Sequence, residues 1–123
     1  LDDDGRCLLL KRSMSSKGNP GRWELTGGKI NQSESFDTAL LREVAEETGL
    51  TISVQHVAGT SESELPKVKV IHLILEGRVE SGQLRLSDEH DAYVWVDPWK
   101  LSSMELADWL RPFAETYGQK RGT

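Results

Sequence analysis

The stretch "LLREVAEETGL" at residues 40–50 restricts the possible folds of this 123-residue chain more than any other segment. It places Glu43, Glu46 and Glu47 within five residues of a segment that has helical periodicity. Residues three and four apart lie on one face of a helix, so these carboxylates point in roughly the same direction and repel one another. Any fold of this chain has to compensate the repulsion.

A helical wheel places two of these carboxylates on the apolar side of the helix. At about 100° per residue, the apolar stripe is formed by Phe36, Leu40 and Val44. Glu43 and Glu47 fall inside this stripe or at its edge, whereas a solvated acidic face would lie opposite. An unpaired carboxylate in that position is costly. We therefore expect compensation from Arg42 and from hard divalent cations, because clustered carboxylate oxygens suit Mg²⁺ or Mn²⁺.

The remaining sequence predicts strands, a helix, further strands and a last helix. Strands are expected at 6–12, 22–25, 50–60, 67–79 and 92–96, with a hydrophilic loop over 60–66 and a turn at 80–83. The helix over 35–48 has Ser33 or Ser35 as its N-cap and Gly49 as the left-handed residue that ends it. This order predicts an α/β protein with a mixed sheet covered by helices.

The C-terminal part leaves two interpretations open. Ser102 and Glu105 have capping-box spacing, which predicts that the last helix begins there. Pro112 either breaks or kinks that helix near Arg111, or it lies at the start of a final short helix. The length favours one domain over 1–123, and the first strand begins so early that a missing preceding segment remains open.

Composition excludes several classes of partner. The net charge of −5 argues against broad affinity for nucleic-acid backbones or anionic membranes. No apolar run approaches the ~20 residues of a membrane span, and no signal peptide is evident. The lone Cys7 is expected to be a buried thiol, in keeping with a cytoplasmic protein. If the substrate is an anion, metal ions have to mediate its binding.

The segment "GKINQSESFDTALLREVAEETGL" (28–50) is similar to the Nudix box, the signature of the Nudix (MutT-related) hydrolases. Gly28, Glu34 and the run from Arg42 to Gly49 occupy its defining positions. The resemblance extends loosely through "CLLLKR", "WELTGG" and "EHDAYVWV". The chain departs at Thr26, where many members carry proline. The family fold is an α/β/α sandwich with a central mixed sheet of parallel and antiparallel strands.

The resemblance implies hydrolysis of a diphosphate linkage in a nucleoside diphosphate joined to another group, with Mg²⁺ or Mn²⁺ required. It makes Glu46 and Glu47 the primary metal ligands and Glu43 a further ligand or the base. The Gly28 carbonyl is an additional ligand, since glycine allows the backbone to approach a metal closely.

Further roles follow from the same resemblance. Arg42 would orient the carboxylates, and Glu34 would brace the loop onto the helix that Gly49 ends. The general base is a box glutamate or Glu89, which can also be a metal ligand. His90 is the alternative base, although a lone histidine is more often a hydrogen-bonding loop residue.

Substrate choice rests on thinner evidence. Arg12 and Arg22 can reach phosphates, and Trp23 can stack on a base, although packing is the commoner role of such a tryptophan. The "EHDAYVWVD" segment resembles small nucleoside-triphosphate pyrophosphohydrolases of the family, which favours a (deoxy)nucleoside triphosphate. Pro66 lies sixteen residues beyond Leu50, a spacing that resembles ADP-ribose-cleaving members, so ADP-ribose or a sugar nucleotide is the alternative. A non-catalytic nucleotide sensor and an RNA-end hydrolase are disfavoured, and both a monomer and a homodimer remain open.

Overall fold

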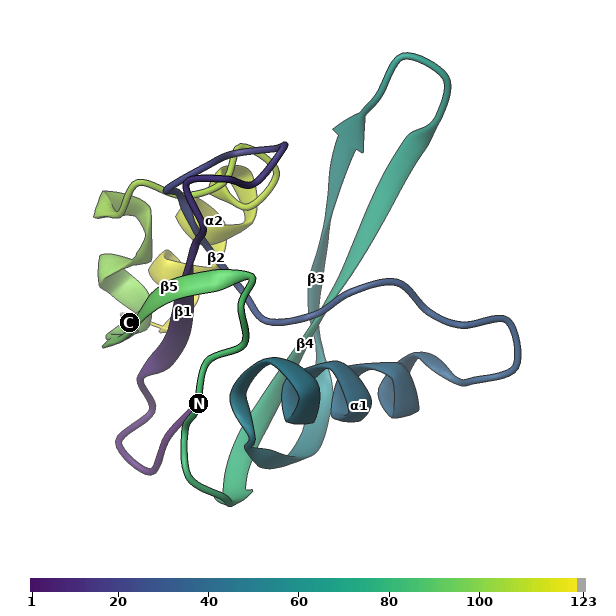
Figure 1. Ribbon diagram of the computed structural model, residues 1–123. Helices are drawn as coiled ribbons and strands as arrows, with labels where there is room; N and C mark the ends of the chain where they lie inside the picture. The colour runs from purple at the N-terminus through teal and green to yellow at the C-terminus, as the bar shows by residue number, and fades with distance from the viewer. Residues whose placement is uncertain (122–123) are drawn as a thin grey trace.

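The computed structural model describes residues 1–121, which form two antiparallel sheets and the helices around them (Figure 1). One sheet has the order β2-β1-β5, with β1 at Cys7–Arg12, β2 at Trp23–Glu24 and β5 at His90–Val96. The other is a long hairpin of β3 (Thr51–Glu64) and β4 (Lys69–Ser81). The expected strands and helices are therefore present, but the named strands form two sheets rather than one central mixed sheet.

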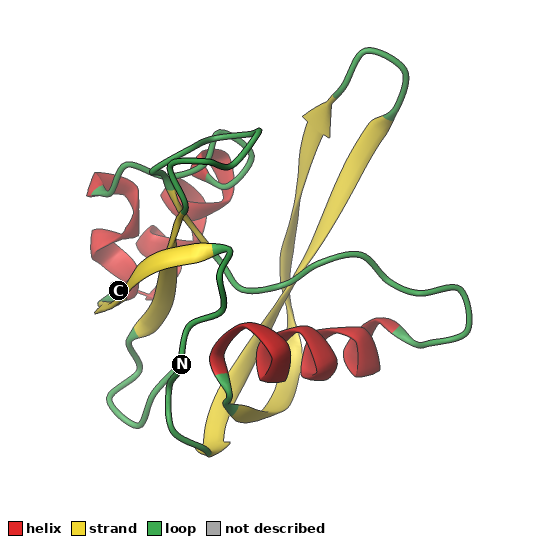
Figure 2. Ribbon diagram, in the orientation of Figure 1, coloured by secondary structure: helices red, strands yellow, loops and turns green. Residues whose placement is uncertain are grey.

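Three helical segments flank these sheets (Figure 2). Helix α1 (Phe36–Thr48) packs on β3, whereas the 3₁₀ helix η1 (Pro98–Ser103) and α2 (Arg111–Arg121) pack on each other. The core lies between β1, η1 and α2, and its buried members are Cys7, Leu9, Ile74, Val96, Leu101, Leu106, Leu110 and Ala114. The expected burial of the Cys7 thiol is confirmed. None of the helices in residues 1–121 is long and apolar enough to cross a bilayer.

Helix α1 begins and ends near the residues that its sequence indicated. The Ser35 side chain accepts a hydrogen bond from the Thr38 N–H, so Ser35 rather than Ser33 is the N-cap. Gly49 adopts φ 74°, and its N–H donates to the Ala45 carbonyl. Phe36 departs from the expected apolar stripe, since 47% of it is exposed.

The loop expected over 60–66 is mostly strand. Strand β3 continues to Glu64, which pairs with Lys69 across the hairpin. Polar side chains also join the two strands here, since the Lys69 ammonium lies 3.1 Å from the Glu62 carboxylate. Hydrophilic composition suggested a loop, but cross-strand backbone pairing does not require apolar side chains.

The capping box expected at Ser102 was wrong, because the chain past η1 pairs with β2 instead of forming a helix. The Trp23 N–H donates to the Glu105 carbonyl, and the Ala107 N–H donates to the Trp23 carbonyl, both at 2.8 Å. These bonds form a parallel bridge between Trp23 and Leu106. Pro112 lies in the first turn of α2, where its missing N–H costs nothing. The alternative of a final short helix is confirmed.

Replacing Gly49 with alanine should destabilise the fold. A Cβ there would be held at a left-handed φ and would lie 3.0 Å from the Gln83 carbonyl oxygen. Left-handed backbone costs a non-glycine residue about 1–2 kcal/mol, and we expect the free energy of unfolding to fall by about that amount. Urea denaturation measures it. Gly18→Ala is the control, because a Cβ at Gly18 meets nothing within 4 Å; equal stability of both variants would contradict the prediction.

Candidate functional site

The guanidinium of Arg42 contacts three carboxylates, those of Glu34, Glu43 and Glu46. Its Nη2 lies 2.7 Å from Glu34, and its Nη1 lies 2.8 Å from Glu43 and 3.4 Å from Glu46. Nη2 also donates to the Lys29 carbonyl at 3.2 Å. The fork of Arg42 therefore joins the helix to the loop before it. The hydrogen bond from Arg42 lowers the pKa of Glu34, and the carboxylates of Glu34 and Glu43 together raise the pKa of Arg42.

The turn at Gly27 and Gly28 brings main chain against two glutamates of α1. The Gly27 N–H donates to Glu47 Oε1 at 3.0 Å, from a backbone with φ 155°. A Cβ added to Gly28 would lie 2.5 Å from the Glu43 carboxyl carbon. Glycine at position 28 thus permits a close approach that a Cβ would hinder, whereas at Gly27 the backbone conformation favours glycine. The adjacent Thr26 has a buried hydroxyl that finds no hydrogen-bond partner among the described residues.

The first residue of β5, His90, is buried beside the end of α1. Its Nε2 lies 2.9 Å from Glu24 Oε2, and its Nδ1 lies 3.7 Å from Glu47 Oε2. The Glu24 carboxylate also receives hydrogen bonds from Arg12 Nη1 at 2.9 and 3.0 Å. Three strands of one sheet therefore supply an Arg12–Glu24–His90 chain that ends at the helix.

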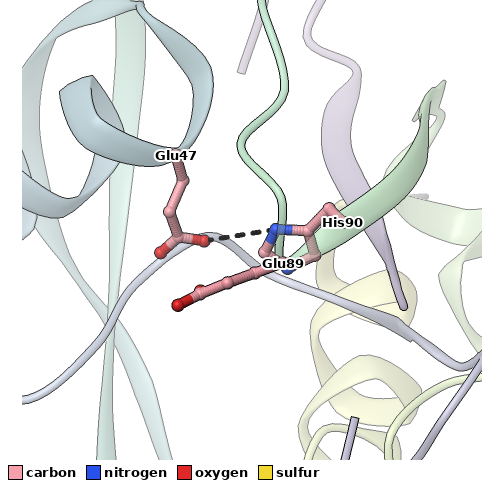
Figure 3. Close-up of side chains that lie close together, drawn as sticks. All are labelled: Glu47, Glu89 and His90. Atoms are coloured by element: carbon pink, nitrogen blue, oxygen red, sulfur yellow. Dashed lines mark ion pairs between the residues drawn. The ribbon is translucent and has the colours of Figure 1, made fainter. Parts of the chain in front are cut away.

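Glu47, Glu89 and His90 form a cluster that can hold a cation (Figure 3). Each offers one ligand atom, and these atoms all lie within 4.8 Å of one another. Backbone hydrogen bonds place the loop that carries Glu89. The Ser13 N–H donates to the Glu89 carbonyl at 3.0 Å, and the Ser87 N–H donates to the Glu47 carbonyl at 3.3 Å. The cluster thus joins α1 to the start of β5.

Burial dominates the electrostatics of Glu47. It raises the pKa of this carboxyl to about 7, against the lowering effects of the Gly27 hydrogen bond and of His90. For His90, burial lowers the pKa, but the hydrogen bond to Glu24 and the charge of Glu47 prevail, so the net shift is upward. The neutral carboxylic acid is therefore accessible at Glu47 near neutral pH.

A cavity of about 820 Å³ adjoins this cluster. Its wall includes Gly28 of the turn, Glu47 of α1, Glu89 and Arg12. Most of the remaining wall is apolar, and α1 and β4 are among the elements that supply it. Such a cavity, with a few convergent polar groups at one place, is typical of a small-molecule site.

The residues expected at the site are partly brought together. Gly28, Glu43, Glu47 and Glu89 gather around the turn, whereas the Glu46 side chain is 58% exposed and contacts Arg42. The three carboxylates of the box therefore do not form one cluster in this structure. The wheel indicated correctly that Glu43 and Glu47 lie on the inner side.

Three expected substrate contacts lie in other surroundings. Arg12 lines the cavity, but its guanidinium is engaged by Glu24 and by the Gly18 carbonyl. Arg22 donates to the Leu106 carbonyl at 3.2 Å, and Trp23 packs against the core. Neither Arg22 nor Trp23 is among the residues that line this cavity.

Sequence reasoning missed Glu24 altogether. The segment "RWEL" was expected to be a strand, and alternation along it separates Glu24 from its neighbour Trp23, which packs in the core. The alternation predicts the face of the strand on which Glu24 lies, but it does not predict which residue Glu24 contacts. The contact with His90 depends on β1 lying between β2 and β5, which no local pattern reveals.

The comparisons with known proteins now decide the family. The sequence profile of the NUDIX domain matches residues 1–117. The chain belongs to the NUDIX family. The α/β Nudix fold and the hydrolase class expected from the box are thereby confirmed.

Individual relatives agree with this assignment. The CTP pyrophosphohydrolase of Escherichia coli (strain K12) is 31% identical, over 95% of this chain and 85% of that protein. The nucleoside triphosphatase NudI of Klebsiella pneumoniae (strain 342) is 28% identical, over 86% of this chain and 83% of that protein. The crystal structure of the MutT protein from Methanosarcina mazei Go1 superimposes with a TM-score of 0.85 and 38% identity, over 99% of this chain and 89% of that one.

The raised pKa of Glu47 predicts how stability depends on pH without metal. The folded chain holds this proton more tightly than the unfolded chain does, so the free energy of unfolding should fall as pH rises from 4.5 to about 7. Glu47→Gln should reduce that fall by an amount of order 1–2 kcal/mol, after allowance for solvent screening. Urea denaturation in EDTA across this range measures it. Glu46→Gln is the exposed control, and an unchanged slope in Glu47→Gln would contradict the assignment.

Proposed function

We propose that this protein is a metal-dependent pyrophosphohydrolase of (deoxy)nucleoside triphosphates, which it converts to the monophosphate and pyrophosphate. The observation that carries the proposal is the meeting of Glu47 and Glu89 beside the Gly28 turn, at the wall of a cavity. Two relatives are named a nucleoside triphosphatase and a CTP pyrophosphohydrolase, which supports this substrate class. We further infer a cytoplasmic location and a monomer or homodimer.

The donor set suits a divalent cation such as Mg²⁺ or Mn²⁺. Carboxylates of Glu43, Glu46 and Glu47, the Gly28 carbonyl and Glu89 would hold it, with Glu46 turning inward from its exposed position. The buried Glu47 carboxylate has a raised pKa and lacks a full set of partners, which fits a group that a cation would stabilise. Once bound, the cation supplies neutralisation of the diphosphate and an acidified water.

The chain's own residues supply proton transfer and positioning. Glu89 is exposed at the cavity wall, so its carboxylate can take the proton of the attacking water as that water adds to phosphorus and pyrophosphate leaves. Glu43 is the less suitable base, since its carboxylate is already engaged by Arg42 at 2.8 Å. Arg42 and Glu34 keep the loop and helix in place around the reacting groups.

The alternative substrate, ADP-ribose or a sugar nucleotide, rests on Pro66. This residue lies in the exposed turn between β3 and β4, where the Leu65 N–H donates to the Val68 carbonyl. Figure 1 shows that turn at the far tip of the hairpin from α1. Its position therefore gives the alternative no support. A non-catalytic sensor is disfavoured because Glu43, Glu46 and Glu47 are all retained.

A substrate screen tests the proposed function. With Mg²⁺ or Mn²⁺, we expect a nucleoside triphosphate to yield monophosphate and pyrophosphate, which chromatography and a pyrophosphate assay identify. AMP and ribose phosphate from ADP-ribose would instead support the alternative. Tight, metal-independent nucleotide binding without turnover of any compound would overturn the enzyme assignment.

The proposed base predicts a kinetic effect at one position. Glu89→Gln should lower kcat by about 10²–10⁴-fold and change KM little, because a general base contributes at that scale and acts in the transition state. Steady-state kinetics over a pH range measures both constants and shows whether the acid limb is lost. Asp88→Asn removes the neighbouring exposed acid and should retain activity. Full activity of Glu89→Gln would contradict Glu89 as the general base and leave Glu43 as the candidate.

A further inference from the structure

The imidazole of His90 has one nitrogen, Nδ1, that makes no hydrogen bond within the described part of the chain and lies 3.7 Å from Glu47 Oε2. The side chain is 1% exposed. A buried polar atom without a partner is uncommon and costs free energy. Such an atom beside two carboxylates points to a ligand that the pair and the imidazole share.

The other ring nitrogen has the partner that metal-bound histidines have. Nε2 lies 2.9 Å from Glu24 Oε2, and Arg12 holds that carboxylate through two hydrogen bonds. Glu24 Oε2 is therefore placed to accept the Nε2–H. Metal-ligating histidines donate their second N–H to a carboxylate in this way, which fixes the tautomer and raises ligand basicity. The tautomer leaves a lone pair on Nδ1.

That lone pair lies beside Glu47 and Glu89. Nδ1 is 3.7 Å from Glu47 Oε2, and a Glu89 oxygen is within 4.8 Å of both (Figure 3). Two ligands that share one cation at about 2.1 Å are separated by at most about 4.2 Å. The pair of His90 and Glu47 meets this limit, and the exposed Glu89 side chain can close the remaining distance by rotation.

We propose that His90 Nδ1 is a direct metal ligand, which together with Glu47 and Glu89 forms a mixed nitrogen–oxygen site. The inference rests on the proposed function, because it concerns the cation of the same site. Mg²⁺ prefers oxygen ligands, whereas imidazole nitrogen is an acceptable ligand for first-row transition ions. The histidine therefore biases the site toward Mn²⁺ over Mg²⁺. The Arg12–Glu24 pair acts through His90 as its positioning group.

Pulsed EPR of the Mn²⁺-bound protein without nucleotide tests this ligand directly. We expect the coupling of a directly bound imidazole nitrogen, and its frequencies should change when histidine alone is labelled with ¹⁵N. The chain has three histidines, so variants assign the signal. His90→Gln should abolish it, whereas His56→Gln, an exposed position on β3, should retain it. The isotope experiment uses the unaltered chain, so it decides even if His90→Gln does not fold.

Metal affinities provide the second readout. His90→Gln should weaken Mn²⁺ binding by about tenfold or more and Mg²⁺ binding by less, measured by titration calorimetry. Bound Mn²⁺ without a histidine coupling, in an enzyme that hydrolyses triphosphates, would overturn this inference alone and leave His90 as an ion-pair partner of Glu47. Absence of any Mn²⁺ or Mg²⁺ binding would overturn the proposed function as well.

Discussion

The burial of the Glu47 carboxylate is the constraint on which the rest of the site depends. Only 5% of this residue is exposed, and burial raises its pKa to about 7. A carboxylate in that position needs donors or counter-charge nearby. They come from two distant segments, the Gly27 N–H and the His90 imidazole. The contacts of Glu47, at the end of α1, therefore reach the turn after β2 and the start of β5.

The other acids of the box are compensated by a different means. Arg42 contacts Glu34, Glu43 and Glu46, all of which lie within eight residues of it along the chain. The members of this network are close in sequence and partly exposed, so each ion pair contributes little to the stability of the fold. Its effect is on geometry, because the planar guanidinium can hold several carboxylates at once. The Arg42 network is thus formed by residues close in sequence, whereas Glu47 is compensated by tertiary contacts.

This division explains what the sequence could predict. The caps of α1 at Ser35 and Gly49 follow from local chemistry, and the inward position of Glu47 follows from the helical period. The sequence alone could therefore predict both. The extended segment near Leu106 depends on its bridge to Trp23. The contact of Glu24 with His90 requires β1 between their strands. Each of these depends on residues far apart in sequence, which periodicity does not register.

The glycine turn shows why the site forms at this junction. The turn that follows β2 crosses the helix face that carries the Glu43 and Glu47 carboxylates. The Gly27 N–H donates a hydrogen bond to Glu47. Gly28 has no side chain, which leaves the space that the Glu43 carboxyl occupies. Backbone atoms of the turn, rather than side chains, therefore lie next to the two carboxylates. Glu47 and Glu89 lie at the cavity wall, where together with His90 they form a cluster that can hold a cation.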